Sequence, residues 1–211
     1  MVNGCMLTEM TDQGASRVER KERTRQALLV GTLALAAERG FGALSLREIA
    51  RSAGIVPTAF YRHFDSLDDL GATLVDEGVQ ALRLALRQLR RTPDARLSET
   101  VRFVFGEVDR KRELYGFLIR EQRGGSPALR TAIALELQLI VRELVADLSR
   151  ITALDDWSPA DLEVAADLLV ATVIDGIADY VGATPREEQP VRDRTVQQIR
   201  LIALGMGAWK P

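Results

Sequence analysis

The stretch from Ser45 to Phe64 reads SLREIARSAGIVPTAFYRHF, and it predicts two short helices joined by a tight turn. Ser45 and Glu48 have the spacing of a capping box, in which the serine hydroxyl and the glutamate carboxylate each accept a backbone amide of the first turn. Gly54 favours the left-handed backbone that ends a helix, and Pro57 suits the first turn of the next one. This pattern is that of a helix-turn-helix, which presents its second helix to the major groove of DNA.

The second helix of this motif has a predicted inner and outer face. At about 100° per residue, Phe60 and Phe64 fall on the same side and are expected to pack inward. An outward arginine can read guanine edges bidentately, and a threonine or alanine methyl group can touch the thymine methyl. The outward face consists of Thr58, Ala59 and Arg62.

Tyr61 and His63 lie on the flanks of that helix, where they suit contacts to phosphate oxygens. His63 is the only histidine, and a surface position or a hydrogen bond in the core is its alternative role. No nucleophile or carboxylate partner is close enough in the sequence to suggest catalysis by it. The predicted DNA-binding residues are therefore Arg23, Ser45, Arg47, Pro57, Thr58, Ala59, Tyr61, Arg62 and His63.

The segment from Arg17 to Leu70 resembles the DNA-binding domain of TetR-type transcriptional regulators. The residues that carry the resemblance are Phe41-Gly42, Ser45-Leu46-Arg47-Glu48-Ile49-Ala50, Ala53-Gly54-Ile55, Phe60-Tyr61-Arg62-His63-Phe64 and Asp68-Asp69-Leu70. Many members carry a lysine near position 67 that touches the phosphate backbone, whereas this chain has Leu67. The resemblance implies a regulator, in most cases a repressor, that binds a palindromic operator in double-stranded DNA as a homodimer.

A narrower resemblance links the chain to the TetR branch that represses fatty-acid synthesis and desaturation genes. It rests on Pro57 to Phe64, Asp68 to Gly71, Val75 to Glu77, Leu118 to Gly124 and Leu129-Arg130. It implies a long-chain fatty acid or acyl-CoA as the effector. The alternative within the family is a regulator of an efflux or catabolic operon that senses another hydrophobic small molecule. The sequence does not indicate whether the effector releases or promotes DNA binding.

Charge is distributed unevenly along the 211 residues, although the net charge is only −2. From Arg17 to Arg62 there are nine Lys or Arg and four acidic residues, whereas residues 66–211 hold 19 basic and 23 acidic ones. The excess of positive charge lies in the segment that would meet phosphates. Its densest cluster is either a phosphate or minor-groove arm or a solvated helix end; it comprises Arg17, Arg20, Lys21, Arg23 and Arg25.

Several classes of protein are not expected. No run of about 18 apolar residues predicts a membrane span, and Met1 to Gly14 lacks the pattern of a secretory signal. Cys5 is the only cysteine, so neither a disulfide framework nor a cysteine-based zinc site is predicted. No phosphate-cradling glycine loop or catalytic constellation is present. We therefore expect a cytoplasmic protein without a catalytic site, metal or cofactor.

The remaining sequence predicts an all-α fold of about nine helices. A first helix is expected at 20–39, and the later ones at 66–91, 95–110, 112–123, 127–151, 159–183 and 190–208, with breaks at glycine- and proline-containing stretches. The expected organisation is a disordered tail (1–16), a helix-turn-helix DNA-binding domain (17–65) and a helical ligand-binding and dimerisation domain (66–211).

The last two long helices are apolar on most of their surface, which requires that most of it be covered. Dimerisation would cover it, and packing on the helix at 127–151 of the same chain is the alternative. The predicted dimer-interface residues are Leu162, Ala166, Val170, Ile174, Ile177, Val196, Ile199, Ile202 and Met206.

An apolar cavity between the helices of the second domain is the predicted effector site. Its candidate lining residues are Val101, Phe103, Phe105, Leu114, Phe117, Leu118, Arg120, Leu137, Ile140, Val141, Leu144, Leu169 and Val173. Each apolar residue among them can equally belong to an ordinary core. Arg120, Glu121 and Arg123 either bind a carboxylate or CoA phosphates or form a solvated ion-pair face.

A candidate from another class of protein is an acyl-binding carrier with a vestigial helix-turn-helix. In the regulator, by contrast, a ligand would tilt the helix at 66–91 and change the spacing of the two recognition helices. Its effect on DNA binding would equal its differential affinity for the two states.

Overall fold

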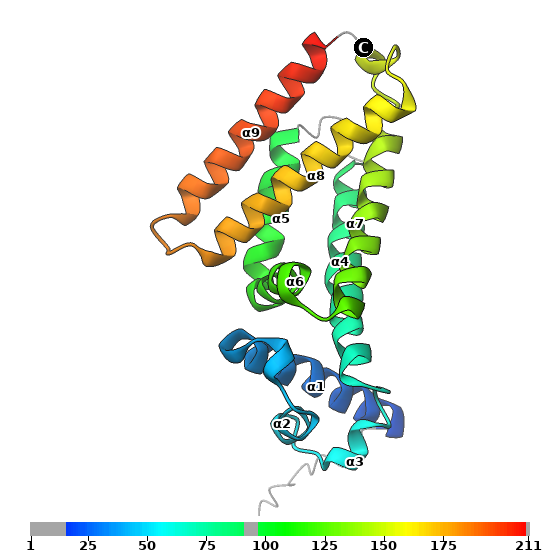
Figure 1. The fold of residues 1–211 in the computed structure, drawn as a ribbon, viewed down its shortest axis with the longest axis vertical. Helices are drawn as coiled ribbons and strands as arrows, with labels where there is room; N and C mark the ends of the chain where they lie inside the picture. The colour runs from blue at the N-terminus through cyan, green and yellow to red at the C-terminus, as the bar shows by residue number, and fades with distance from the viewer. Residues whose placement is uncertain (1–15, 91–96, 210–211) are drawn as a thin grey trace, which may run out of the picture.

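The computed structural model describes residues 16–90 and 97–209, which form a two-part, elongated helical molecule (Figure 1). Its helices are α1 (Arg17–Arg39), α2 (Leu46–Ser52), α3 (Pro57–Phe60), α4 (Leu67–Arg90), α5 (Leu97–Arg110), α6 (Arg112–Gly124), α7 (Pro127–Leu148), α8 (Pro159–Gly182) and α9 (Glu188–Ala208). Two short 3₁₀ turns, η1 (Phe41–Ala43) and η2 (Thr152–Leu154), follow α1 and α7. These residues contain no strand, so the predicted all-α fold is confirmed. The predicted tail at 1–16 lies outside the described residues except for Ser16.

Helix starts follow local signals in the sequence. Ser16 and Glu19 form a capping box that begins α1 at Arg17, three residues before the predicted start. The Ser126 hydroxyl caps α7, whose first residue is Pro127. The breaks predicted after α6, α7 and α8 are confirmed, because each falls between two observed helices.

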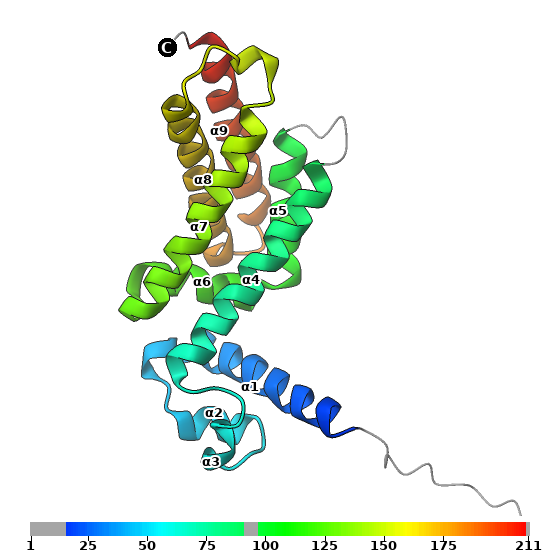
Figure 2. The same ribbon diagram turned by 90° about the vertical axis from the view of Figure 1, so that its right-hand side faces the viewer.

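The first three helices form a small domain at one end, and α4 runs from it into a bundle built with α5 to α9 (Figures 1 and 2). In that bundle α7 packs on α4, α6 and α8, and α9 packs on α5 and α8. Arg83 ties α4 to α7 through ion pairs with Glu143 (2.6 Å) and Glu136 (3.4 Å). None of the helices in the described ranges is both long and apolar enough to cross a membrane.

The two parts meet where α6 lies against α1, close to η1 (Figure 1). Phe41 of η1 is buried there, with its ring edge-on to Phe117 of α6 at a centroid distance of 5.5 Å. A methyl group on Gly71 of α4 would lie 3.1 Å from the Phe41 ring and 2.8 Å from Leu129 of α7, so only glycine leaves room at this crossing. Phe41 thus packs against α4 and α6 at the junction between the N-terminal helices and the bundle.

Candidate nucleic-acid interface and ligand cavity

The capping box predicted at the start of α2 is confirmed. The Ser45 amide donates to the Glu48 carboxylate (2.9 Å), and the Ser45 hydroxyl accepts from the Glu48 amide (3.3 Å). Hydrogen bonds from the Ser45 hydroxyl and amide, with a further one from Arg39, lower the pKa of Glu48 to about 2. The Ser45 side chain is therefore engaged in fixing the start of α2.

The second helix of the motif is shorter than predicted, because α3 ends at Phe60. Residues 61–63 form a turn, in which the Arg62 amide donates to Ala59 (3.2 Å) and the His63 amide donates to Phe60 (2.8 Å). Phe60 and Phe64 are buried with their ring centroids 5.7 Å apart, as the periodicity predicted. Arg62 is exposed, as are Thr58 and Tyr61. Ala59, which was predicted to face outward, is half-buried.

Arg25 of α1 braces this motif from behind. Its guanidinium lies 4.5 Å from the centroid of the Phe64 ring and donates to the His63 carbonyl at 3.5 Å. A cation over an aromatic face is attracted by the ring quadrupole. Arg25 thus holds the segment that follows α3 against α1.

His63 is half-buried, and this burial lowers the pKa of its imidazole, with the charges of Lys21, Arg25 and Arg62 adding to the effect. Its Nδ1 is buried and meets no hydrogen-bond partner within residues 16–90 and 97–209. A neutral imidazole supplies a hydrogen-bond donor to a phosphate but no charge. His63 is therefore suited to positioning rather than to electrostatic attraction.

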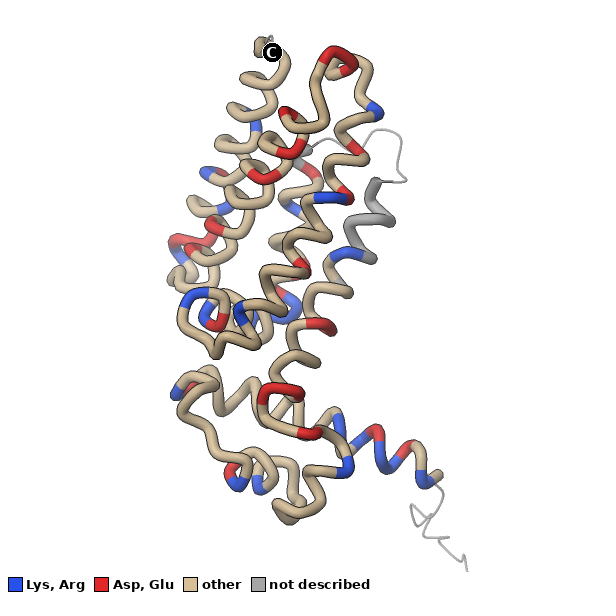
Figure 3. Tube along the Cα trace, turned by 45° about the vertical axis from the view of Figure 1, so that its right-hand side comes forward, with Lys and Arg blue, Asp and Glu red and all other residues tan. Residues whose placement is uncertain are grey.

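The basic cluster before the first apolar residues is helical. Arg17, Arg20, Lys21 and Arg23 are exposed within α1 itself, and their role as a phosphate or minor-groove arm stays a prediction. Figure 3 shows blue segments gathered at the free end of α1 and on α2. Arg47 and Arg51, exposed on α2, extend the basic surface, whereas Leu67 packs on the core.

A largely apolar cavity of about 500 Å³ opens between α5, α7, α8 and α9. Leu148 of α7 and Leu154 of η2 line it at the end of α7, and Leu82 of α4 also belongs to its wall. Its wall also contains Val101, Ile140, Leu144, Leu169, Val173 and Met206. Its volume lies in the range of small-molecule sites, roughly 300–1,000 Å³.

The predicted ligand-binding residues divide into three groups. Five line this cavity: Val101, Ile140, Leu144, Leu169 and Val173. Leu118 and Leu137 instead line a second, smaller cavity, which Ile140 also touches. The rest line neither of these two cavities, and their contact with an effector stays a prediction; these are Phe103, Phe105, Leu114, Phe117, Arg120 and Val141.

None of the predicted dimer-interface residues is exposed. Five line the main cavity, namely Val170, Ile174, Ile177, Ile199 and Met206. Leu162 and Ala166 are buried, and Val196 and Ile202 are half-buried against the core of the same chain. The exposed apolar side chains on these two helices are instead Val164, Leu168, Leu201 and Leu204, at 52–71% exposure. Helical periodicity finds apolar faces but does not tell which face the rest of the chain covers.

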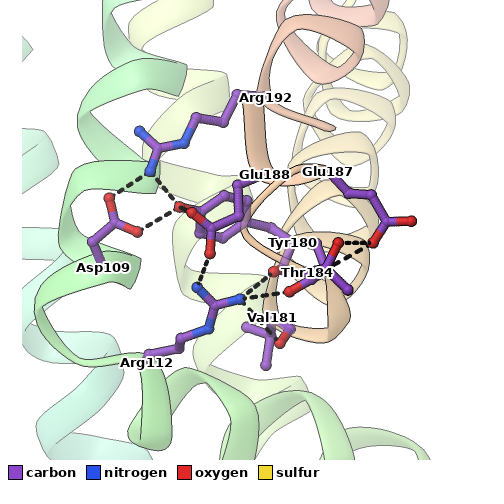
Figure 4. A network of polar contacts seen from close by, with 9 residues as sticks. Asp109, Arg112, Tyr180, Val181, Thr184, Glu187, Glu188 and Arg192 are labelled. Carbon is purple, nitrogen blue, oxygen red and sulfur yellow. Dashed lines mark hydrogen bonds and ion pairs between the residues drawn. The ribbon is translucent and has the colours of Figure 1, made fainter. Parts of the chain in front are cut away.

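A polar network joins α5, α6, α8 and α9 (Figure 4). Arg112 donates to Glu188 (2.5 Å) and to three carbonyls at the end of α8, those of Tyr180 (2.9 Å), Val181 (3.3 Å) and Ala183 (3.2 Å). A cation that donates to the last carbonyls of a helix also interacts favourably with the negative end of the helix dipole. Arg112 thus holds the end of α8 onto α6.

The hydroxyl of Tyr180, a buried residue, donates to Asp109 of α5 (2.5 Å), and Arg192 of α9 donates to the same carboxylate (2.5 Å). Burial raises the pKa of Asp109, but the hydrogen bonds from Tyr180 and Arg192 and the charges of Arg192 and Arg112 outweigh it and leave that pKa below its ordinary value. No pattern in the sequence indicates this network, because its partners lie up to 83 residues apart.

The three charged residues near the end of α6, Arg120, Glu121 and Arg123, lie in different environments. Arg120 is exposed, and Arg123 forms an exposed ion pair with Asp175 (3.1 Å). Glu121, by contrast, is buried at the junction, where burial raises its pKa and the Phe41 amide, which donates to its carboxylate, partly offsets that rise. Asp179 pairs with Arg194 of α9. Within the described ranges, no three His, Cys, Asp or Glu side chains gather to hold a metal ion.

The sequence matches two models of known protein families. Residues 28–72 match the family model described as "Bacterial regulatory proteins, tetR family", and residues 93–205 match "Tetracyclin repressor-like, C-terminal domain". The two matches together span more than half of the chain.

Three solved structures illustrate the likeness of the fold. A transcriptional regulator from Rhodococcus sp. Rha1 has 23% sequence identity and a TM-score of 0.69, with 86% of this chain and 96% of that chain covered. The fatty acid degradation regulator FadR from Bacillus halodurans has 17% identity and a TM-score of 0.69, with 84% and 96% covered. A complex of SmeT with triclosan has 19% identity and a TM-score of 0.69, with 86% and 90% covered. These identities show a shared fold alone, whereas the family models identify the family. The chain belongs to the TetR family of bacterial regulatory proteins.

Proposed function

We propose that this chain is a repressor that binds a palindromic operator as a homodimer and responds to a hydrophobic small molecule. The TetR family consists of DNA-binding transcriptional regulators rather than enzymes. The observation that carries the proposal is the presence, in one chain, of a helix-turn-helix and a 500 Å³ apolar cavity, with a packed junction between the two domains.

The surface of α3 supports sequence-specific binding. Arg62 is exposed for base contacts beside Thr58, and Tyr61 is 62% exposed for contacts to phosphate. Arg47 of α2 and Arg23 of α1 supply positive charge on the same domain. Together these side chains provide both base reading and the salt-dependent attraction on which affinity depends.

The exposed stripe on α8 and α9 supports dimerisation. Val164 and Leu168 lie one turn apart on α8, and Leu201 and Leu204 lie one turn apart on α9. Large apolar side chains exposed in this way suit an interaction site, and a reader of a palindrome needs two half-sites at a fixed spacing. We assign this stripe, rather than the residues predicted from periodicity, to the homodimer.

A long-chain fatty acid or acyl-CoA is the effector that we propose first, because the cavity wall is mostly aliphatic and suits a hydrocarbon chain. A regulator of an efflux or catabolic operon that senses another hydrophobic molecule is the second candidate. One observation favours it: none of the described residues lining the cavity is Lys, Arg or His. An anionic head group would therefore have no described counter-ion inside the cavity.

The decisive experiment is fluorescence anisotropy with duplexes from the region upstream of the gene. Titrations with palmitate, palmitoyl-CoA and triclosan separate the two effector classes. A salt-sensitive, sequence-specific complex altered by the acyl compounds alone is the expected result. Specific binding that responds only to triclosan would favour the second class. A chain that binds the acyl compounds without measurable duplex affinity would be an acyl carrier.

The dimer is tested separately by sedimentation equilibrium of Leu204→Glu. A charge in the stripe should shift the mass toward that of one chain and weaken operator binding. Leu135→Glu is the matched control, because Leu135 is a similarly exposed leucine (56%) on α7, outside the stripe. If both variants stay dimeric, the stripe is not the interface.

A further inference from the structure

The main cavity has a smaller neighbour. A second cavity of about 40 Å³ lies between α4, α6, α7 and α8. This volume is little more than that of one water molecule in the liquid, about 30 Å³, so several carbons of a chain enter only if the walls of the cavity move apart. Its walls include Val79, Tyr115, Leu118, Ile119, Gln122, Ile133 and Leu137.

The two cavities share four wall residues, all aliphatic: Leu82, Ile140, Ile174 and Ile177. A partition of this kind contains no side-chain hydrogen bond or ion pair that an entering hydrocarbon would break. Aliphatic side chains move between staggered rotamers, so the partition can open by local repacking. The smaller cavity is therefore a potential extension of the larger one.

Residues along α7 give the length of the combined path. Leu148, Leu144 and Ile140 line the main cavity, and Ile140, Leu137 and Ile133 line the small one. At 1.5 Å per residue, Leu148 to Ile140 spans roughly 12 Å, and Ile133 lies roughly 10 Å farther on. An extended chain of C–C bonds of about 1.5 Å advances roughly 1.3 Å per carbon. About ten carbons therefore reach the partition, and about sixteen to eighteen extend through both cavities.

The far end of this path is α6, the helix that contacts the DNA-binding domain. Leu118 lines the small cavity and packs tightly on α4, where a methyl group on Gly78 would lie 3.1 Å from it. The adjacent residue, Phe117, stacks edge-on against Phe41. Burial raises the pKa of Tyr115 to about 12, so its phenol stays neutral at physiological pH and this end of the path gains no charge from it.

We propose that the small cavity is a distal compartment of the effector site, which receives the last carbons of a long acyl chain when the partition at Ile140 and Ile177 opens. The proposal rests on the acyl effector class proposed above. Long chains enter it and displace α6, whereas chains of about ten carbons stop at the partition. The compartment thus makes both affinity and the response at DNA depend on chain length.

Isothermal titration calorimetry with decanoyl-CoA and palmitoyl-CoA tests this inference, and the free acids repeat the comparison without CoA. The wild-type chain should bind palmitoyl-CoA at least about tenfold more tightly than decanoyl-CoA. Leu137→Phe, which fills the small cavity, should bring that ratio close to one by weakening palmitoyl-CoA alone. Leu137→Ala, which enlarges it, should increase the ratio, so the inference does not depend on one variant folding.

Val173→Phe is the matched control, because Val173 lines only the main cavity. It should weaken both ligands by the same factor. An unchanged chain-length ratio in both Leu137 variants would overturn the distal compartment and leave the acyl effector standing. If the wild-type chain binds operator but none of the acyl compounds, the acyl class fails together with the compartment, and the DNA-binding function stands.

Discussion

The helix-turn-helix and the α8–α9 hairpin are built on different length scales. In the former, the decisive contacts are local, as between Ser45 and Glu48, which are three residues apart. In the latter, Arg112 reaches carbonyls 68 to 71 residues away, and Arg192 reaches a carboxylate 83 residues away. The polar side chains that tie the hairpin to α5 and α6 hold the fold, whereas the exposed face of α3 is left free for a partner. Substitutions in this polar network should therefore change stability, and those on α3 should change binding.

The largest expected effect is that of Arg112→Ala. It removes the donors to three α8 carbonyls and to Glu188, in a part-buried site, and should lower the free energy of unfolding by about 2–4 kcal/mol. Urea unfolding followed by circular dichroism measures it. Arg123→Ala is the control, because the exposed pair with Asp175 should contribute at most about 1 kcal/mol. Equal losses in the two variants would contradict the role given to the network.

Gly176→Ala comes next. The added methyl group would lie 2.4 Å from the Thr195 hydroxyl and 2.8 Å from the Thr195 methyl. Because the β-branched threonine side chain has few alternative rotamers, it cannot easily move aside. We therefore expect the free energy of unfolding to fall by about 1–3 kcal/mol. Gly31→Ala in the DNA-binding domain meets the Ser52 hydroxyl, which can rotate away, and should cost less. Thermal melts of both variants, with Gly182→Ala as a control in open space, test this order.

On α3, Arg62→Ala should leave the melting temperature unchanged and cost about 1–3 kcal/mol of operator binding, with relaxed preference at one base position. Fluorescence anisotropy on the operator and on single-base variants measures both. A loss of the same size on every sequence would mean that Arg62 contacts only phosphate.

His63 should give a smaller, pH-dependent effect. Because the pKa of His63 in the folded chain lies below the ordinary histidine value of 6.5, the unfolded chain binds more protons as the pH falls through 6.5. Stability is therefore unaffected above that pH, decreases as the pH falls toward the folded pKa, and levels off below it. Thermal melts between pH 7.5 and 5 should show this decrease in the wild-type chain and a flatter profile in His63→Gln. Parallel profiles would exclude His63 as the cause.

The smallest effect is expected for Arg23→Ala. Removing one exposed cation should weaken all duplexes alike and reduce the slope of log affinity against log salt by about one. Anisotropy titrations at several salt concentrations measure the slope, and an unchanged slope would remove Arg23 from the interface.

The sequence was most informative where a residue's partner is close in the chain. The capping box of α2, the inward Phe60 and Phe64 and the exposed Arg62 all followed from spacing. The same reasoning failed for Ile174 and Ile199, because an aliphatic residue on a helix looks alike whether it faces a core, a cavity or a second chain. It also missed the burial of Glu121, whose carboxylate accepts a hydrogen bond from the Phe41 amide of the other domain.

By itself, the sequence determined the all-α class, the helix-turn-helix and the family, since caps, turns and periodicity act over a few residues. The tertiary structure decided which apolar faces enclose the cavity, which remain exposed on α8 and α9, and which side chains link the domains. These outcomes depend on how helices far apart in the chain cross, because burial is a property of the whole packed molecule rather than of any one helix.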